Sequence, residues 1–307
     1  MSRIAVVGAG AWGTALAVHA ARAGHEVVLW ARNPSFATTR ISPRLPQVTL
    51  PGAVHVTGTL PGAADAVLLA MPTQHMRSVL TGWCPGGPAV LCMKGLETGT
   101  LLLPAELLAT LHPGVAACIL TGPNFAHEVA AGLPAAAVVA GAGREAVMHL
   151  LATPTLRLYG NDDPVGAQLG GAAKNVIAIA AGIVMGRGLG ENARAALITR
   201  GLAELARLVV TLGGRAETVA GLSGLGDLLL TCTGGASRNY TYGLALGAGQ
   251  VPGGAGVVEG VATAPALVAR AAGTDLPVCA AVAALLAGSI TVDDAIAALL
   301  SRPRRDE

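Results

Sequence analysis

A glycine-rich motif near the amino terminus has the residue types and spacing that bind a dinucleotide. Gly8, Gly10 and Gly13 form the pattern G-x-G-x-x-G. The apolar run at residues 3–8 predicts a buried strand before the motif, and the Ala-rich run at residues 14–23 predicts a helix after it. In that setting the glycines permit a tight turn, close approach to a pyrophosphate and close helix–strand packing. The motif therefore predicts a nucleotide-binding loop, and a purely structural glycine turn is the alternative.

The end of the next predicted strand, residues 25–30, carries a basic residue where an acidic one is usual. Arg32 lies 19 residues after Gly13 and is followed by Asn33. An NAD-binding chain typically places a carboxylate near this point to bind the ribose, whereas an arginine pairs with the 2′-phosphate of NADP. The sequence thus predicts that NADPH is the preferred cofactor and that NAD remains possible. A solvated surface arginine is the alternative.

Two lysines and one aspartate stand out in apolar surroundings. Lys94 follows the predicted strand at residues 88–93, at the sheet edge where parallel α/β folds bind ligands. Lys174 lies inside an apolar helix, where burial lowers the pKa of an amine and favours acid–base catalysis. Asp227 is the only acidic residue between Glu217 and Glu259 and is the candidate partner of Lys174. Surface exposure of Lys94 and an ordinary ion pair for Lys174 are the alternatives.

A serine–arginine–asparagine triplet follows two glycines. Ser237, Arg238 and Asn239 come after Gly234 and Gly235. A serine at a helix start, free backbone N–H groups, a guanidinium and an amide together suit a phosphate group. Ordinary helix capping by the serine is the alternative.

The order of the predicted elements indicates the fold that positions these groups. Strands at residues 3–8, 25–30, 66–71, 88–93 and 116–120 alternate with helices, which predicts an α/β domain with a doubly wound, Rossmann-like sheet. The proline-rich stretch 41–62 is predicted to be a surface loop with short extended pieces, and residues 221–226 a glycine-rich break between helices.

Beyond Pro164 the pattern predicts helices alone. Residues 165–184 form a buried helix and residues 192–212 a one-sided one, with further helices at residues 261–272, 276–286 and 291–300 and Thr291 as an N-cap. The chain thus divides into a nucleotide-binding domain at residues 1–164 and an all-helical domain at residues 165–307.

Composition narrows the class of protein. Charged residues make up 12 % of the chain and the formal net charge is +2, which argues against binding to nucleic acid. The hydrophobic share of 52 % argues against disorder. Mean hydropathy is +0.59, but apolar stretches such as residues 276–290 are shorter than the roughly 20 residues of a spanning helix, so no stable membrane insertion is expected.

The first residues and the cysteines bear on the cellular compartment. The amino-terminal run has some features of a signal peptide, but its cleavage would destroy the predicted strand–helix–strand unit. The five cysteines are scattered and contain no C-x-x-C pair, which is typical of buried thiols in a reducing cytoplasm. We therefore expect a cytoplasmic protein, and we predict no metal site.

Several segments, in order along the chain, closely resemble the bacterial NAD(P)-dependent sn-glycerol-3-phosphate dehydrogenases. They are residues 8–17, 94–97, 122–126, 174–175, 192–201, 224–228, 231–233, 237–239 and 258–261. The segments around Asp227 and Ser237 are specific to that family rather than to dinucleotide-binding proteins at large. The resemblance implies reversible reduction of dihydroxyacetone phosphate, a phosphorylated triose, to sn-glycerol 3-phosphate for phospholipid synthesis.

The resemblance also implies roles for individual residues. Lys174 would transfer the proton, Lys94 would touch both substrate and cofactor, and Asp227 would be an acid of the substrate site. The other substrate contacts would be Gly122, Asn124, Ser237, Arg238 and Asn239. Besides the three motif glycines, the cofactor contacts would be Ala11, Trp12, Arg32, Asn33, Lys94, Ala126, Arg238, Val257 and Glu259. A homodimer is expected from the family and from the apolar helices.

The sequence departs from the family at four places, and two other functions stay open. Ala11, Met93 and Asn124 stand where serine, threonine and serine are common, and Arg44 replaces an aromatic residue. None of these changes removes a group that the chemistry requires.

Two other functions are alternatives to the glycerol-3-phosphate dehydrogenase activity: a reductase of another substrate, such as ketopantoate, and a non-enzymatic NADPH sensor. The triplet at residues 237–239 argues against the first, and paired lysines at the cleft argue against the second.

Overall fold

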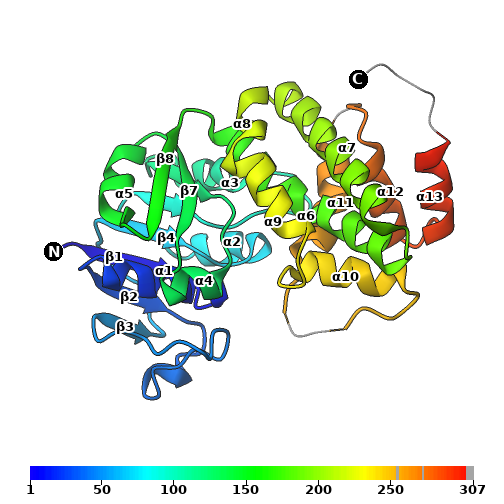
Figure 1. Cartoon of the computed structure of the whole chain (residues 1–307). Coiled ribbons are helices and arrows are strands. Elements are labelled where there is room, and N and C mark those ends of the chain that lie inside the picture. The colour runs from blue at the N-terminus through cyan, green and yellow to red at the C-terminus, as the bar shows by residue number, and fades with distance from the viewer. Residues whose placement is uncertain (254–255, 272, 302–307) are drawn as a thin grey trace.

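The chain folds into two lobes that are connected through one long helix. The computed structural model describes residues 1–253, 256–271 and 273–301. Figure 1 shows a sheet with flanking helices in one lobe and a bundle of helices in the other, with α6 (Pro164–Gly186) between them. The last strand ends at Asn161, three residues before α6 begins. We propose that residues 1–164 and 165–307 are the two domains.

The sheet lobe contains one eight-stranded sheet within the described residues. Its strands are β1 (Arg3–Val7), β2 (Glu26–Trp30), β3 (Val54–Thr57), β4 (Ala66–Leu69), β5 (Ala89–Leu91), β6 (Ala117–Thr121), β7 (Ala135–Gly141) and β8 (Leu156–Asn161). Their order is β3-β2-β1-β4-β5-β6-β7-β8, and only the pairing of β6 with β7 is antiparallel. The first six strands have the order of a dinucleotide-binding sheet, which confirms the predicted fold class.

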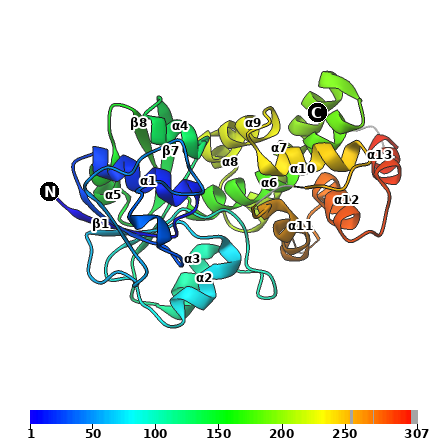
Figure 2. The ribbon, with the colours of Figure 1, turned by 90° about the horizontal axis from the view of Figure 1, so that it is seen from below.

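Helices cover both faces of this sheet, as Figure 2 shows. One face packs against α1 (Ala11–Arg22), α4 (Ala126–Ala131) and α5 (Arg144–Leu151), and the other against α2 (Thr73–Leu80) and α3 (Pro104–Leu111). Alternation of side chains along a strand explains the two cores. In β1, Ile4 and Val6 are buried with α1, whereas Ala5 and Val7 are buried with α2 and α3.

The helical lobe is built around α6. Its other helices are α7 (Gly190–Thr211), α8 (Ala216–Ala220), α9 (Asp227–Cys232), α10 (Arg238–Gly247), α11 (Glu259–Arg270), α12 (Pro277–Leu286) and α13 (Val292–Leu300). Glycines let α6 and α10 approach backbone to backbone, because a side-chain carbon at Gly182 would meet the Tyr240 carbonyl at 2.1 Å and one at Gly243 the Ile179 carbonyl at 2.0 Å. The high Gly and Ala content thus serves close helix packing. Thr291 caps α13, as predicted.

Helix α6 corrects the expectation that every apolar stretch is too short to span a membrane. Its 23 residues pass that test by length and composition, and no other described helix does so. However, 89 % of its most apolar window lies buried inside the fold. The other helices of this lobe, among them α7, α9, α10 and α11, pack against α6. Its apolar surface is therefore that of a core helix.

Two strands and one helical turn differ from the predictions. β7 was missed because its sequence is mainly alanine, which has a low preference for strands, and β8 because only a short alternation marks it. β3 is one of the extended pieces that were predicted within residues 41–62. The predicted glycine-rich break is wrong, since Leu222–Gly226 form a π-helical turn that leads directly into α9. Residue 272, the predicted end of one helix, lies outside the described residues.

Candidate active site

The glycine motif forms a tight loop between β1 and α1. The backbone N–H of Gly8 donates to the carbonyl of Trp30, so the loop lies beside the end of β2. A side-chain carbon at Gly13 would lie 1.8 Å from the Gly8 carbonyl oxygen, so only glycine fits at this position. By contrast, one at Gly10 would meet nothing within 4 Å. The open space at Gly10, together with uncapped N–H groups at the start of α1, fits the pyrophosphate of a dinucleotide.

The predicted adenine-side contacts lie at the end of β2. Arg32 and Asn33 are both exposed, and the Asn33 side chain accepts a hydrogen bond from the Ser35 N–H at 3.1 Å. Ala11 and Trp12 begin α1, and Ala126 begins α4, which packs against α1. Ala11 and Trp12 thus lie directly at the glycine loop, whereas Arg32 and Asn33 follow the end of β2, beside which that loop lies.

Both lysines of the sequence meet one buried aspartate. The chain contains two lysines, Lys94 and Lys174. The Nζ atom of Lys174 lies 2.7 Å from Asp227 Oδ1, and that of Lys94 lies 2.5 Å from Asp227 Oδ2. Asp227 is 1 % exposed. One carboxylate thus joins the sheet lobe, through the loop after β5, to α6 and α9 of the helical lobe.

Each lysine has one further hydrogen bond, which fixes its position. Lys174 donates to the Thr231 hydroxyl at 2.7 Å, and that hydroxyl donates to the Asp227 carbonyl at 2.6 Å. Lys94 donates to the Gly122 carbonyl at 3.1 Å. An ammonium group has three N–H donors, so these bonds leave each lysine one donor for a substrate oxygen.

Burial changes the acid strength of Lys174. Desolvation lowers the pKa of Lys174 from 10.5 to about 8; the Asp227 carboxylate opposes this shift and the Lys94 charge adds to it. An amine with such a pKa exchanges its proton readily near neutral pH, which is the property a general acid–base requires.

The triplet at residues 237–239 lies at the start of α10. The Ser237 hydroxyl caps the helix by accepting from the Tyr240 N–H at 3.2 Å, which confirms the alternative that this serine is a helix cap. Asn239 is also engaged, since its amide donates to Asn175 Oδ1 at 2.9 Å and accepts from the Gly260 N–H at 2.9 Å. Arg238 is exposed. The helix start and the Arg238 guanidinium are therefore the groups that remain for an anion.

Polar groups from both lobes converge around Gly95. A side-chain carbon at this residue would lie 3.2 Å from the hydroxyl oxygens of both Thr73 and Thr263, and 3.5 Å from Glu259 Oε2. Both hydroxyls are fully buried and, among the described residues, have no hydrogen-bond partner. Burial raises the pKa of Glu259 to about 7, against the effect of the Arg238 charge. An unsatisfied buried hydroxyl costs about 1–3 kcal/mol, so a polar ligand group here is stabilising.

Two family models match almost the whole chain. The model described as NAD-dependent glycerol-3-phosphate dehydrogenase N-terminus matches residues 3–147, and the corresponding C-terminus model matches residues 163–297. The chain belongs to the NAD-dependent glycerol-3-phosphate dehydrogenase family. It is therefore an oxidoreductase, and the sensor alternative is excluded.

Individual members of this glycerol-3-phosphate dehydrogenase family agree with that assignment. Proteins of this name, with NAD(P)+ as cofactor, from Acidiphilium cryptum and Gluconobacter oxydans are 58 % and 52 % identical over 315 and 314 residues. These alignments cover 99 % and 98 % of this chain, and 98 % and 97 % of the relatives. A glycerol-3-phosphate dehydrogenase structure from Coxiella burnetii superposes with a TM-score of 0.91 at 35 % identity, covering 98 % of this chain and 99 % of that one.

Some groups of this dehydrogenase site escaped the sequence analysis. Thr231 bonds Lys174, and its position four residues after Asp227 on one helix is a signal that points to it. Nothing in the sequence marks the hydroxyls of Thr73 and Thr263. Asn124, by contrast, was predicted as a substrate contact. It donates to the Ala136 carbonyl at 3.0 Å, and its buried Oδ1 has no partner in the described structure.

Among the described residues, no group of three or more His, Cys, Asp or Glu residues is placed to hold a metal ion.

Proposed function

We propose that the chain reduces dihydroxyacetone phosphate to sn-glycerol 3-phosphate, and catalyses the reverse reaction, with Lys174 as the proton donor and acceptor. The observation that carries the proposal is the contact of Lys174 and Lys94 with buried Asp227, at the sheet edge that also holds the glycine loop. The family membership supplies the reaction class, and the lysine geometry supplies the proton path.

The chemistry divides between the cofactor and the protein. Bound NADPH supplies the hydride that reduces the ketone carbon. Lys174 uses its remaining N–H group to donate a proton to the ketone oxygen. Lys94 stabilises negative charge on that oxygen, and Asp227 holds both ammonium groups in place. In the reverse direction neutral Lys174 accepts the alcohol proton.

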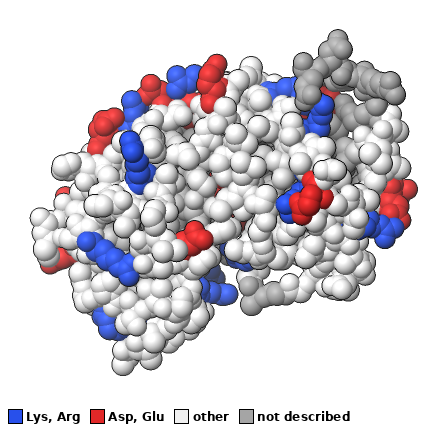
Figure 3. All heavy atoms as spheres, viewed as in Figure 1, with Lys and Arg blue, Asp and Glu red and all other residues white. Residues whose placement is uncertain are grey.

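The phosphate of the substrate is proposed to bind at the start of α10. The first N–H groups of that helix and the Arg238 guanidinium provide the positive potential. Ser237 and Asn239 then act mainly by shaping this helix start, through the cap and through the link to Asn175 and Gly260. Figure 3 shows Lys and Arg side chains in the notch between the lobes, on a face where most of the surface is uncharged.

An absorbance assay tests the proposed reaction. Purified protein is given dihydroxyacetone phosphate with NADPH or NADH, and ketopantoate serves as the control substrate. We expect decay of the nicotinamide absorbance with dihydroxyacetone phosphate and not with ketopantoate. Decay with ketopantoate alone would show that the start of α10 is not a phosphate site.

Arg32 is proposed to select NADPH over NADH. Loss of a charge-assisted hydrogen bond costs about 1.5–3 kcal/mol, so Arg32→Gln should raise the KM for NADPH by about 10- to 100-fold. The KM for NADH should stay within about twofold, because NADH has no 2′-phosphate. Arg157→Gln, at an exposed arginine of β8, is the matched control. An unchanged KM for NADPH in Arg32→Gln would make Arg32 an ordinary surface residue.

The proposed setting of the enzyme follows from its family and composition. We propose a cytoplasmic homodimer that supplies glycerol 3-phosphate to phospholipid synthesis, that does not insert into the membrane and that binds no nucleic acid. Exposed apolar side chains of the helical lobe, such as Leu189, Val210 and Leu244, offer surface for a second copy. Sedimentation equilibrium should give twice the chain mass of 30.3 kDa, and a mass of one chain would refute the dimer.

A further inference from the structure

A cavity with basic side chains opens on the sheet lobe, away from the catalytic lysines. Its volume is about 510 Å³, which lies within the range of small-molecule pockets. The end of α1, the end of α4 and the segment that joins α5 to β8 form its walls. The glycine motif lies at the opposite end of α1, and a helix of 12 residues separates the two by roughly 15 Å. The cavity is therefore separate from the dinucleotide site.

The titratable side chains that line the cavity are all basic. They are His19 and Arg22 from α1, His25 from the turn after it, and His149 from α5. No aspartate or glutamate lines the cavity within the described residues. Arg22 supplies the permanent positive charge of this lining and no carboxylate opposes it there, which favours an anionic ligand.

One of the imidazoles presents a hydrogen-bond acceptor to the cavity. The Nε2 atoms of His19 and His25 each lie 2.7 Å from a carbonyl oxygen, of Leu151 and Leu150 respectively. A carbonyl oxygen only accepts, so Nε2 carries a proton in both rings. Burial lowers the pKa of His19, which keeps its ring neutral and leaves Nδ1 as an acceptor. The Nδ1 atom of His25 is buried, so a ligand in the cavity does not reach it.

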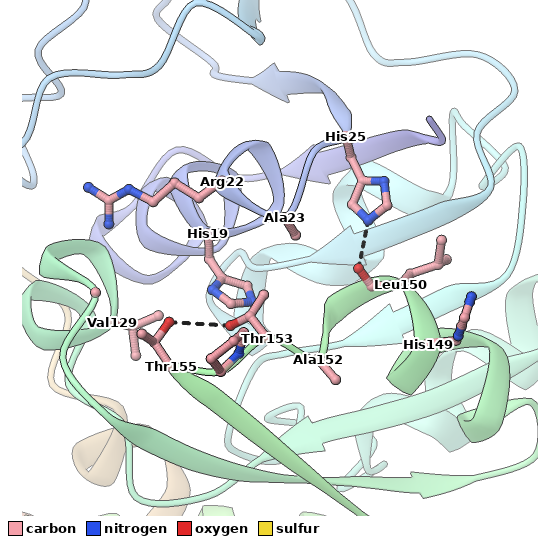
Figure 4. A pocket seen from close by; sticks show the side chains of 12 residues that line it. His19, Arg22, Ala23, His25, Val129, His149, Leu150, Ala152, Thr153 and Thr155 are labelled. Atoms are coloured by element: carbon pink, nitrogen blue, oxygen red, sulfur yellow. Dashed lines mark hydrogen bonds between the residues drawn. The ribbon is translucent and has the colours of Figure 1, made fainter.

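The rest of the lining completes a mixed polar and apolar site. The hydroxyls of Thr153 and Thr155, which bond each other at 3.2 Å, line the same cavity as His19 (Figure 4). Arg22 bonds the Ala130 carbonyl through one nitrogen, and the guanidinium has further N–H donors for a ligand. Val129 supplies apolar contact.

We propose that this cavity binds a small hydroxylated organic anion, with its carboxylate or phosphate group on Arg22 and a hydroxyl group donating to Nδ1 of His19. The two side chains lie three residues apart on α1, so one small molecule can reach both. An oxyanion matches the guanidinium, and a hydroxyl donor matches the Nδ1 atom. A simple inorganic anion without a hydroxyl group would satisfy Arg22 alone.

Histidine ring NMR of the full chain tests this site directly. Citrate and glycerol 2-phosphate are the carboxylate and phosphate probes, each titrated at constant ionic strength against sodium chloride. We expect the ring signals of His19, His25 and His149 to shift saturably with one dissociation constant. His55, His75 and His112 lie outside the cavity, so their signals should stay constant, and binding at the active site should leave the three cavity signals unmoved.

Two variants distinguish specific binding in this cavity from a general effect of ionic charge on the histidine signals. Arg22→Gln keeps a donor for the Ala130 carbonyl but removes the charge, and it should weaken binding of the probe at least about tenfold. His149→Ala changes an exposed side chain and should also weaken binding without affecting folding. Arg157→Gln is the control and should bind normally.

The outcomes decide the proposal. A saturable response to either probe that Arg22→Gln weakens supports the site, and the probe that responds identifies carboxylate or phosphate as the preferred group. Shifts that never saturate, that affect all histidines alike or that persist in Arg22→Gln would overturn it. The absorbance assay of the main reaction is independent of these signals, so the two proposals fail separately.

Discussion

Lys174→Met should lower the rate of dihydroxyacetone phosphate reduction by about 10²- to 10⁴-fold, the usual contribution of a general acid–base. Methionine fills a similar volume on α6 but carries no proton. Asp227 keeps its other partner, Lys94, so its buried charge stays paired and the site should fold. NADPH binding, followed by nicotinamide fluorescence, should remain within about threefold of the wild-type value.

The pH dependence gives the Lys174 prediction a second readout. The pKa of Lys174 is about 8, so the group is mostly protonated below this pH and mostly neutral above it. Reduction requires the protonated form, and its rate should fall as the pH rises through about 8. Oxidation requires the neutral form, and its rate should rise over the same interval. Both limbs should disappear in Lys174→Met.

Gln168→Met is the matched control for Lys174→Met. It also replaces a buried polar side chain of α6 by methionine, and it breaks bonds to the Ala105 N–H and the Pro164 carbonyl. It should lower stability but keep both pH limbs. A Lys174→Met protein that retains more than a tenth of the wild-type rate would exclude Lys174 as the proton donor.

Much of this site follows from residue types that are rare in the sequence. Lys174 and Asp227 were paired from their isolation among apolar residues, and the structure places them 2.7 Å apart. The same reasoning gives no partner for Lys94, because its contact with Asp227 depends on how the two lobes meet. Contacts between lobes leave no periodic or local signal in a sequence.

The parts that were missed have physical causes of the same kind. Two strands, β7 and β8, escaped because their local preference is weak and neighbouring strands stabilise them, as with the alanines of β7. The Ser237 hydroxyl was expected at a phosphate but caps α10, since a serine serves either purpose with the same geometry. The unpaired hydroxyls around Gly95 follow from tertiary packing alone.

Asp227→Asn should damage turnover and stability together, because one carboxylate neutralises both lysines. Asparagine is nearly the same size but leaves the Lys174 and Lys94 ammonium groups facing each other without an anion. The Asp227 charge raises the pKa of Lys174, so its removal should lower that pKa below about 8. The fall in reduction rate should then begin at a lower pH than in the wild type, and turnover at pH 8 should drop by at least about 10²-fold.

The stability of Asp227→Asn should depend on pH in a defined direction. Removing one partner of a buried ion pair costs about 3–5 kcal/mol. In the folded variant Lys174 has a lowered pKa, whereas in the unfolded chain it keeps a proton up to about pH 10. The unfolded state therefore binds more protons between these values, and the free energy of unfolding should rise with pH across that interval. Urea unfolding at pH 7 and pH 9 measures the difference.

Asp163→Asn provides the comparison for Asp227→Asn. Asp163 is a buried aspartate that caps α6 and bonds the N–H groups of Gly166 and Arg215, with no lysine near it. Asparagine keeps one of these two bonds but turns an NH2 group, which only donates, towards the other N–H. This variant should therefore lose stability by about 1–3 kcal/mol but keep the wild-type pH profile. If Asp227→Asn kept the wild-type fall in reduction rate near pH 8 and unfolded with the same pH dependence as Asp163→Asn, Asp227 would not be the group that sets the charge state of the lysines.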